Sequence, residues 1–380
     1  MAKPSIGVLH RLAPSHRAPT PEAVAGALVA LHSTDPASVH LAIAARTAGE
    51  GATIADVDRA LYDDRTVVRV MGMRRTLWAV PADLVAVVAA ACGRDIAAAE
   101  RRKLVAALEE QGVAADGQGL VADLEEQTLA ALADGREVLT TELADDVPAL
   151  KGTVRYGGSS KWAADVSLSS RIVLLLTCDG RIVRTRPQGS WTSNLNRYAL
   201  APPGGEPMEG PEARAELARR WLAAFGPASE DVVRDLKWWA GWTVAATKQA
   251  LGSAGDVPAP EALSAAERGE VEPWAALVPS LDPTTMGWKD RSWYLGDLGP
   301  ALFDANGNAG PAIWWSGRMV GGWAQRATGE VVTRLLVDIG REGTDAVQAE
   351  AARLQRWLDA GGTVVKPRFR TPLQHELASS

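Results

Sequence analysis

The chain has 380 residues, of which 47% are hydrophobic and 23% charged, so it can bury more than one core and we expect two to four domains. No run approaches the roughly eighteen apolar residues that a membrane span needs, and the N-terminal MAKPSIGVLHRL is too weakly apolar for a secretory signal. We therefore expect a cytoplasmic protein. Cys92 and Cys178 have no Cys or His at ligand spacing, which predicts packed thiols and no metal site.

The formal net charge of −6 argues against a nucleic-acid partner, but the charge is unevenly distributed. Residues 151–197 contain eight basic and two acidic side chains, a net charge of +6, so the rest of the chain carries −12. Such a segregation indicates one surface that faces a polyanion, such as duplex DNA, on an otherwise acidic body. A solvated basic face without a partner is the alternative.

Residues 1–82 have the element order of a winged helix-turn-helix. Thr20 and Pro21 begin a helix that should extend to Ser33, and Asp35 caps a second helix that runs to about Arg46. Thr53 opens a third helix, and residues 67–80 have the β-branched, apolar character of a pair of strands. The third helix is rich in aspartate, so it is unsuited to a phosphate-lined major groove.

Residues 83–203 predict a second winged unit. Helices are expected over 83–111 and 122–133 and from Thr140 or Thr141 to near Pro148, and a further helix ends in a turn at Asp179 and Gly180 before a strand. The glycine-rich basic loop over 151–162 is a candidate probe into a DNA groove; a disordered insertion is the alternative.

The remainder predicts a third winged unit over 204–275 and a C-terminal β-rich domain over 276–380, after a Pro- and Gly-rich linker over 201–212. In the third unit Trp238, Trp239 and Trp242 follow helical spacing, as core anchors do. The last domain should contain one helix over 345–358, capped by glycines at 361–362, and a final strand over 364–369. The expected fold class is α+β. No glycine-rich phosphate loop or nucleophile elbow occurs, which disfavours nucleotide-driven and serine-hydrolase chemistry.

Four stretches, in this order, resemble the winged-helix DNA glycosylases of the AlkZ and YcaQ type, which remove alkylated bases. They are ALHSTDPASVHLAIAAR at 30–46, VMGMRRTLWAVP at 70–81, LVPSLDPTTMGWKDR at 277–291 and PAIWWSGRMVGGWAQRATGEV at 311–331. The resemblance implies three tandem winged-helix units in a C-shaped body around duplex DNA, closed by the C-terminal β-rich domain.

The family's catalytic signature is Gln, an apolar residue, then Gln or Asp, and it corresponds here to His32, Ser33 and Thr34, followed by Asp35. The chain therefore resembles a His-x-Thr-Asp branch of the family. An N-alkylated purine is already a cationic leaving group, so the enzyme must mainly hold a water and stabilise an oxocarbenium-like transition state. The resemblance implies that His32 orients or deprotonates this water, Thr34 fixes it and Asp35 supplies negative charge. An N-cap role for Asp35 and a structural role for His32 are the alternatives.

Candidate DNA contacts are basic residues near this stretch and in the basic segment: His40, Arg74, Arg75, Lys151, Arg155, Lys161, Arg184 and Arg186. Together these features predict a monomeric, monofunctional DNA glycosylase without metal or cofactor. It would act at the nucleoid on N-alkylated purines, including bulky natural-product adducts, in DNA repair or self-resistance. A non-catalytic DNA-binding protein or transcriptional regulator is the main alternative, and a protein-interaction module is a weaker one.

Overall fold

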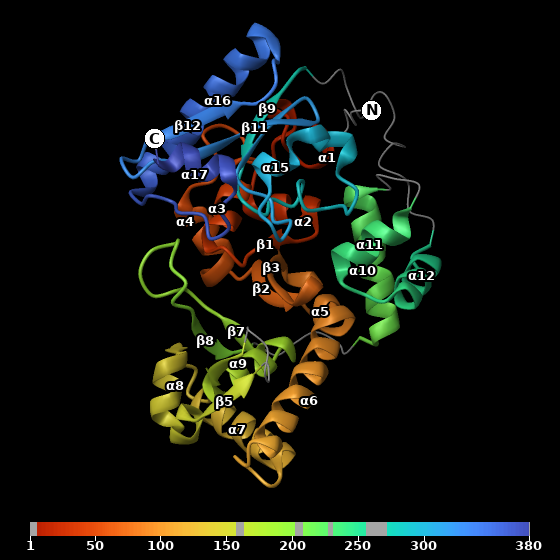
Figure 1. The fold of residues 1–380 in the computed structure, drawn as a ribbon, viewed down its shortest axis with the longest axis vertical. Helices are drawn as coiled ribbons and strands as arrows, with labels where there is room; N and C mark the ends of the chain where they lie inside the picture. The colour runs from red at the N-terminus through yellow and green to blue at the C-terminus, as the bar shows by residue number, and fades with distance from the viewer. Residues whose placement is uncertain (1–5, 157–162, 202–207, 227–230, 256–271, 380) are drawn as a thin grey trace.

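The computed structural model describes residues 6–156, 163–201, 208–226, 231–255 and 272–379. In Figure 1 the N-terminal helices and the C-terminal sheet form the upper part of the molecule, and residues of the basic segment lie in the lower part. A helical run connects the two parts, made of a 3-10 turn at Ala82–Leu84, α5 at Val85–Val88, a π-helical turn at Ala89–Gly93 and α6 at Arg94–Glu110.

The first segment folds in the order helix, strand, helix, helix, strand, strand. Its elements are α2 (Pro21–Leu28), β1 (Leu31–His32), α3 (Pro36–Ala44), α4 (Ile54–Asp58, continued by a π-helical turn to Asp63), β2 (Val67–Gly72) and β3 (Thr76–Pro81). The sheet order is β1-β3-β2, with antiparallel pairing. Local signals account for the helix starts: the Thr20 hydroxyl accepts the Ala23 amide, and Thr53 and Asp56 form a reciprocal capping box.

One helix boundary expected from the sequence is wrong. The helix predicted to reach Ser33 ends at Leu28, because Val29 adopts a φ of 64° and turns the chain out of the helix. Leu31 and His32 then pair with Ala79 and Trp78 of β3. Pairing with a distant strand, which local periodicity does not reveal, thus places His32 in a sheet and not at a helix end.

The second segment repeats this order and strand pairing, with one insertion. Its elements after the connecting run are α7 (Gly117–Ala131), β4 (Val138–Leu139), α8 (Thr140–Asp146), β5 (Thr153–Tyr156), β6 (Ala164–Ser167), α9 (Leu168–Cys178), β7 (Ile182–Arg184) and β8 (Arg197–Leu200). The sheet order is β4-β8-β7. The inserted hairpin β5-β6 forms the described flanks of the basic loop expected over 151–162; residues 157–162, including Lys161, lie outside the described residues.

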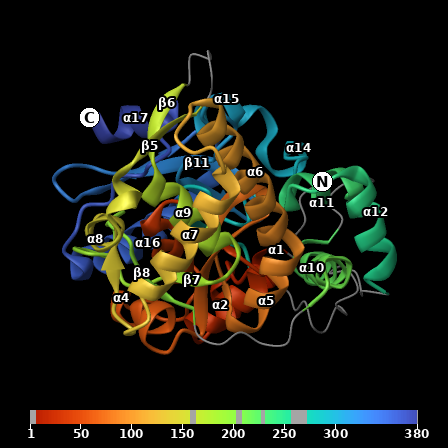
Figure 2. The same ribbon diagram turned by 90° about the horizontal axis from the view of Figure 1, so that it is seen from below.

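Three helices lie to one side of the upper part, where Figure 2 shows them grouped: α10 (Gly210–Phe225), α11 (Val232–Ala240) and α12 (Val244–Ser253). Trp239 and Trp242 are buried and Trp238 is half-buried against the same core. The prediction that these tryptophans anchor a core is therefore confirmed. The described part of 204–275 is helical until β9 begins at Ala275, and residues 256–271 are outside the description.

The C-terminal region is built on an antiparallel sheet with the order β12-β11-β10-β9. Its strands are β9 (Ala275–Val278), β10 (Ala312–Trp315), β11 (Arg318–Gln325) and β12 (Val331–Leu335), and its helices are α14 (Ser292–Leu295), α15 (Gly299–Leu302), α16 (Gly340–Gly361) and α17 (Pro372–Ser379). The predicted helix over 345–358 is confirmed within α16, which ends at Gly362 in the left-handed conformation.

The final strand predicted over 364–369 is wrong, and α17 was not predicted. Residues 364–369 run without strand pairing, because side chains of other elements take two of their amide protons. The Val365 amide donates to Gln325 Oε1 at 2.8 Å, and the Arg368 amide donates to Asp35 Oδ2 at 2.9 Å. The segment thus connects the C-terminal sheet to the start of α3.

A buried ion pair joins the N-terminal helices to the C-terminal region. Arg46 donates from Nη2 to Asp282 Oδ1 at 2.6 Å and from Nη1 to Oδ2 at 2.8 Å, and both side chains are fully buried. Beside them His10 Nδ1 lies 2.8 Å from the Thr284 hydroxyl. Within the described residues, no helix has the length and apolar character to cross a membrane.

Candidate active site

His32 is held in β1 as a neutral, buried imidazole. Its side chain is 4% exposed, and its ring lies 4.8 Å from the Trp78 ring between centroids. Burial, together with the positive charge of Arg74, lowers the pKa of His32 to about 3. The Thr34 amide donates to His32 Nδ1 at 3.4 Å, so the proton of the neutral ring belongs on Nε2.

Asp35 uses both carboxylate oxygens to hold backbone. Oδ1 accepts the Ala37 amide at 3.2 Å, which confirms the predicted N-cap of α3, and Oδ2 accepts the Arg368 amide. Burial raises the pKa of this carboxyl group, against the lowering effect of these two hydrogen bonds. The arrangement fixes the turn that carries Thr34 against the C-terminal region.

A cavity of about 220 Å³ lies next to Thr34, and its lining is strongly basic. Arg69 of β2, Arg75, Arg184 of β7 and Arg368 contribute to the lining, together with Ser33, Thr34, Asn194 and Asn196. His32 and Asp35 are outside this lining. The oxygens Ser33 Oγ and Thr34 Oγ1 are buried and have no hydrogen-bond partner among the described residues, so they are available to a bound group.

The structure brings together Thr34, Arg75 and Arg184 of the residues that the sequence singled out. Arg75 remains half exposed and donates to Glu100 Oε2 at 2.8 Å. Arg74 lies apart from the cavity, with its guanidinium 4.3 Å from the centroid of the Trp238 ring, and burial lowers its pKa to about 10.

The other candidate DNA contacts that the structure describes are paired within the protein; Lys161 lies outside the described residues. His40 is fully buried and its Nε2 lies 2.9 Å from Asp58 Oδ1, while Arg186 donates to Asp58 and Asp63. Lys151 pairs with Asp145 and Arg155 with Asp165, in both cases on the surface. Their contacts with DNA therefore stay predictions, and each requires that DNA competes with an existing ion pair.

The sequence analysis did not identify the arginine and asparagine side chains that Arg69, Arg368, Asn194 and Asn196 contribute to the cavity. Arg69 gave a signal, since it is the one charged residue within the apolar strand β2. Arg368 and the two asparagines lie in irregular segments that reach the cavity only through the tertiary fold.

The loop between β7 and β8, residues 185–196, reaches across to the first segment and to α16. In Figure 1 it extends from the lower part toward α4. Trp191 packs between His40, at 5.1 Å, and Trp357, at 5.6 Å between ring centroids. This β7–β8 loop therefore positions Asn194 and Asn196 at the cavity, and through Trp191 it also packs the lower part of the molecule against the upper part.

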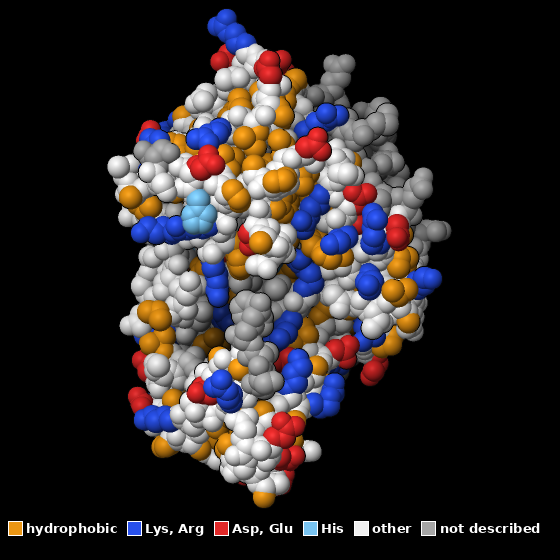
Figure 3. All heavy atoms as spheres, in the orientation of Figure 1, with side chains coloured by type: hydrophobic (Ala, Val, Ile, Leu, Met, Phe, Trp, Pro, Cys, Tyr) orange, Lys and Arg blue, Asp and Glu red, His pale blue; other side chains and the backbone are white. Residues whose placement is uncertain are grey.

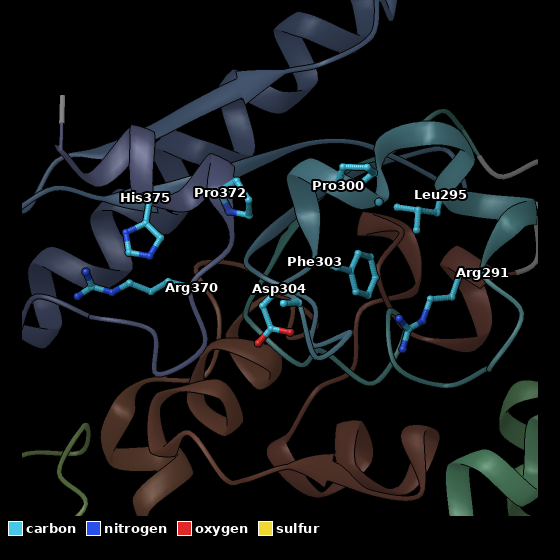
Figure 4. Close-up of a pocket in the computed structure, with 10 residues that line it drawn as sticks. Arg291, Leu295, Pro300, Phe303, Asp304, Arg370, Pro372 and His375 are labelled. Atoms are coloured by element: carbon cyan, nitrogen blue, oxygen red, sulfur yellow. The ribbon is translucent and has the colours of Figure 1, made fainter. Parts of the chain in front are cut away.

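A larger hollow of about 650 Å³ lies between α15 and α17. Figure 4 shows Arg370 and His375 on one side of it and Arg291 on the other, with Phe303 and Asp304 between them. None of the residues predicted from the sequence lines it. In Figure 3 Lys and Arg side chains also gather along the waist between the upper and lower parts of this face.

Cys92 and Cys178 are free and buried, as predicted, and burial raises the pKa of each thiol to about 12. Within the described ranges no three His, Cys, Asp or Glu side chains gather in a way that could hold a metal ion. The polar groups that line the basic cavity are guanidinium, hydroxyl and amide groups.

Comparisons with known proteins agree with this architecture. The chain superimposes on the DNA glycosylase AlkZ of Streptomyces sahachiroi with a TM-score of 0.67 and 18% sequence identity, covering 97% of this chain and 99% of that one. At this identity the likeness shows the fold alone. No curated protein matches the sequence. A family model described as DNA glycosylase AlkZ-like matches residues 25–357, and the chain therefore belongs to the AlkZ-like DNA glycosylase family.

Proposed function

We propose that this protein is a monofunctional DNA glycosylase that hydrolyses the N-glycosidic bond of N-alkylated purines in duplex DNA. It acts as a monomer on nucleoid DNA, in repair or in self-resistance to an alkylating metabolite. The observation that carries the proposal is the basic cavity at the position of the family's catalytic stretch: Thr34 lies there among four arginines. Cationic side chains at a small polar cavity suit a sugar-phosphate backbone.

The repeated element order supports two of the three winged-helix units. Both segments run helix, strand, helix, helix, strand, strand, with sheet orders β1-β3-β2 and β4-β8-β7. We assign the third unit to residues 204–275, whose described helices are α10, α11 and α12. In this assignment the units form a C-shaped body, and duplex DNA binds at the basic waist seen in Figure 3.

In the proposed reaction Thr34 is the catalytic residue. Its hydroxyl, which has no partner among the described residues, holds the water that attacks C1′. The C1′–N9 bond breaks with its electron pair going to the cationic purine, which departs as a neutral base, and the proton that the attacking water loses passes to solvent. His32 is a positioning residue: its Nδ1 accepts the Thr34 amide and so fixes the direction of that hydroxyl. Asp35 is also a positioning residue, because both of its oxygens hold backbone amides.

The test is base release from a duplex that contains N7-methylguanine, followed by alkaline cleavage of abasic sites. The wild-type protein should release the base, and His32→Ala should lower the rate while DNA binding persists. His32→Asn, compared with His32→Ala, distinguishes a positioning role from general-base catalysis, because the asparagine side-chain oxygen can replace Nδ1 as an acceptor but cannot act as a base. Recovery of activity in His32→Asn supports positioning; equal loss in both variants assigns general-base catalysis to His32.

A DNA-binding protein without catalysis is the competing function. Two observations favour the non-catalytic function: His32 is buried, and both carboxylate oxygens of Asp35 accept backbone amides, so neither side chain lines the cavity. Duplex binding that weakens steeply with salt, combined with no base release from N7- or N3-alkylpurines, would establish this alternative. Loss of DNA binding as well would reject both functions.

A further inference from the structure

The basic cavity next to Thr34 gathers positive charge that its own lining residues do not neutralise. Four arginines line it, and no Asp or Glu is among its described lining residues. Among the described residues, Arg75 is the only one of the four that forms an ion pair, with Glu100. The other three, Arg69, Arg184 and Arg368, come from β2, β7 and the segment after α16, so three separate parts of the fold bring cations to one small volume.

Arg69 is the most unusual of the four. Its side chain is 2% exposed, and none of its three guanidinium nitrogens makes a hydrogen bond of good geometry to a described residue, although Arg69 lies close enough to the Tyr62 hydroxyl to act on its pKa. Its guanidinium carbon lies 5.6 Å from the centroid of the Tyr62 ring. The positive charge of Arg69 helps to lower the pKa of Asp58, but no described carboxylate forms an ion pair with it. A buried charge that is compensated only in part is unfavourable in a folded protein, which indicates that a ligand completes the site.

Arg184 repeats this pattern from the facing strand. Its Nε is buried without a hydrogen-bond partner in the described residues, and its guanidinium carbon lies 5.7 Å from the Tyr198 ring centroid. Burial lowers the pKa of Arg184, and the nearby charges of Arg69 and Arg368 lower it further. The guanidinium groups of Arg69, which is buried, and Arg184, which is partly buried, repel each other across the cavity, and one anion would stabilise both.

Neutral hydrogen-bond donors complete the lining. The hydroxyl groups of Ser33 and Thr34 are unpartnered, and the side chains of Asn194 and Asn196 reach the same volume from the β7–β8 loop. Paired N–H groups of arginine and single hydroxyl donors are the combination that satisfies the oxygens of a phosphoryl group. At about 220 Å³ the cavity is smaller than the roughly 300–1,000 Å³ of a typical ligand pocket.

We propose that this cavity binds a single phosphoryl oxyanion, with Arg69 and Arg184 as its principal contacts and Arg75 and Arg368 as further contacts. In function the oxyanion is one phosphodiester of the DNA strand next to the damaged nucleotide, so that the adjoining deoxyribose lies beside Thr34. The identification with DNA rests on the proposed function. The binding of an oxyanion does not, and inorganic phosphate should bind to the free protein.

The first experiment measures inorganic phosphate binding to the full chain by thermal unfolding and calorimetry, with chloride at equal ionic strength as the reference. A ligand specific for the folded state raises the unfolding temperature as its concentration rises. Arg69→Met should weaken phosphate binding about 10- to 100-fold, as expected for the loss of charge-assisted hydrogen bonds. Arg219→Met, which removes an exposed arginine paired with Glu216 on α10, is the matched control and should bind phosphate normally.

Arg69→Met should fold, because replacing a buried charge that has no ion pair among the described residues by an apolar side chain of similar size is neutral or stabilising. Without phosphate its unfolding temperature should equal or exceed that of the wild type. If Arg69→Met does not fold, Arg368→Gln, at an exposed residue of the same cavity, provides the same comparison. Phosphate affinity equal to wild type in the folded variants would overturn the oxyanion site.

The second experiment identifies the source of the phosphoryl group. Duplexes that contain an abasic analogue carry one neutral methylphosphonate at successive positions around it. One position should weaken binding of the wild type about tenfold and leave Arg69→Met unaffected. If phosphate binds but no position has this effect, the site takes a free phosphate and the DNA assignment is wrong. Because neither experiment requires base release, failure of the proposed catalytic activity is recognised separately.

Discussion

Asp58 accepts a 2.5 Å hydrogen bond from Arg186, a residue 128 positions later in the chain. The other oxygen of the same carboxylate, Oδ1, lies 2.9 Å from His40 Nε2. Asp58 thus connects the β7–β8 loop to the buried face of α3, and Trp191 of this loop covers His40. The contact joins the second segment of the chain to the first beside the basic cavity.

A double-mutant cycle on this pair should give a measurable coupling energy. Arg186→Met and Asp58→Asn are each expected to destabilise the protein, and the double variant should lose about 0.5–1 kcal/mol less than their sum. The value is modest because Arg186 is half exposed. Urea unfolding at equal ionic strength measures it. The local surface pair of Arg326 and Glu330 is the control, and a coupling no larger than in this control would show that the contact does not secure the loop.

The buried pair of Arg46 and Asp282 should contribute much more to stability. Asp282→Asn leaves the Arg46 guanidinium buried without its counter-charge, which typically costs about 3–5 kcal/mol. Urea unfolding should show this as a lowered midpoint with an unchanged slope. Asp345→Asn removes an acid from an exposed pair with Arg341 and should change the free energy of unfolding by less than about 0.5 kcal/mol. Similar effects of the two variants would contradict the importance assigned to the buried pair.

Acid should destabilise the fold below pH 6.5 through its buried histidines. Burial lowers the pKa of His10 and of His32 to about 3, whereas both groups titrate near 6.5 in the unfolded chain. Between these values the unfolded state binds the proton and the folded state does not, so stability rises with pH and is lost as pH falls. Each histidine should contribute a slope of about 1.4 kcal/mol per pH unit.

His10→Asn measures this contribution directly. Above pH 7 the substitution changes the free energy of unfolding only through lost packing and hydrogen bonds, and this change is the same at every pH. Between pH 6.5 and 5 the free energy of unfolding of the variant should depend on pH with a slope about 1.4 kcal/mol per pH unit smaller than that of the wild type. Urea unfolding at four pH values gives both curves. Parallel curves would mean that His10 is protonated in the folded protein.

The sequence predicted features that depend on neighbouring residues. Asp35 before Pro36 and the Thr53 capping box begin helices through contacts within three positions, so both were correctly placed. Thr34 was identified through the resemblance to a family, and the structure places it at the basic cavity. Its role there stays a prediction.

Features that depend on distant contacts were missed. β1 exists because Leu31 and His32 pair with β3, and residues 364–369 fail to form a strand because Asp35 and Gln325 take their amides. Arg69 stands out as a charged residue within an apolar strand, but only the fold brings it to Arg184 and Arg368. Because the site is assembled from three separate segments, no single segment shows that these arginines meet.

The contribution of the Thr34 hydroxyl to base release should be measurable separately from the packing of the Thr34 side chain. Thr34→Ser keeps the hydroxyl and should retain most of the rate of base release. Thr34→Val keeps the shape of the side chain and removes the hydroxyl. It should lower the rate roughly tenfold or more, because one hydrogen bond that stabilises the transition state is lost. Single-turnover assays with N7-methylguanine duplex, and binding assays on the same DNA, separate catalysis from affinity. Equal rates in Thr34→Val and the wild type would remove Thr34 from the reaction, and an equal loss in Thr34→Ser would assign the effect to packing.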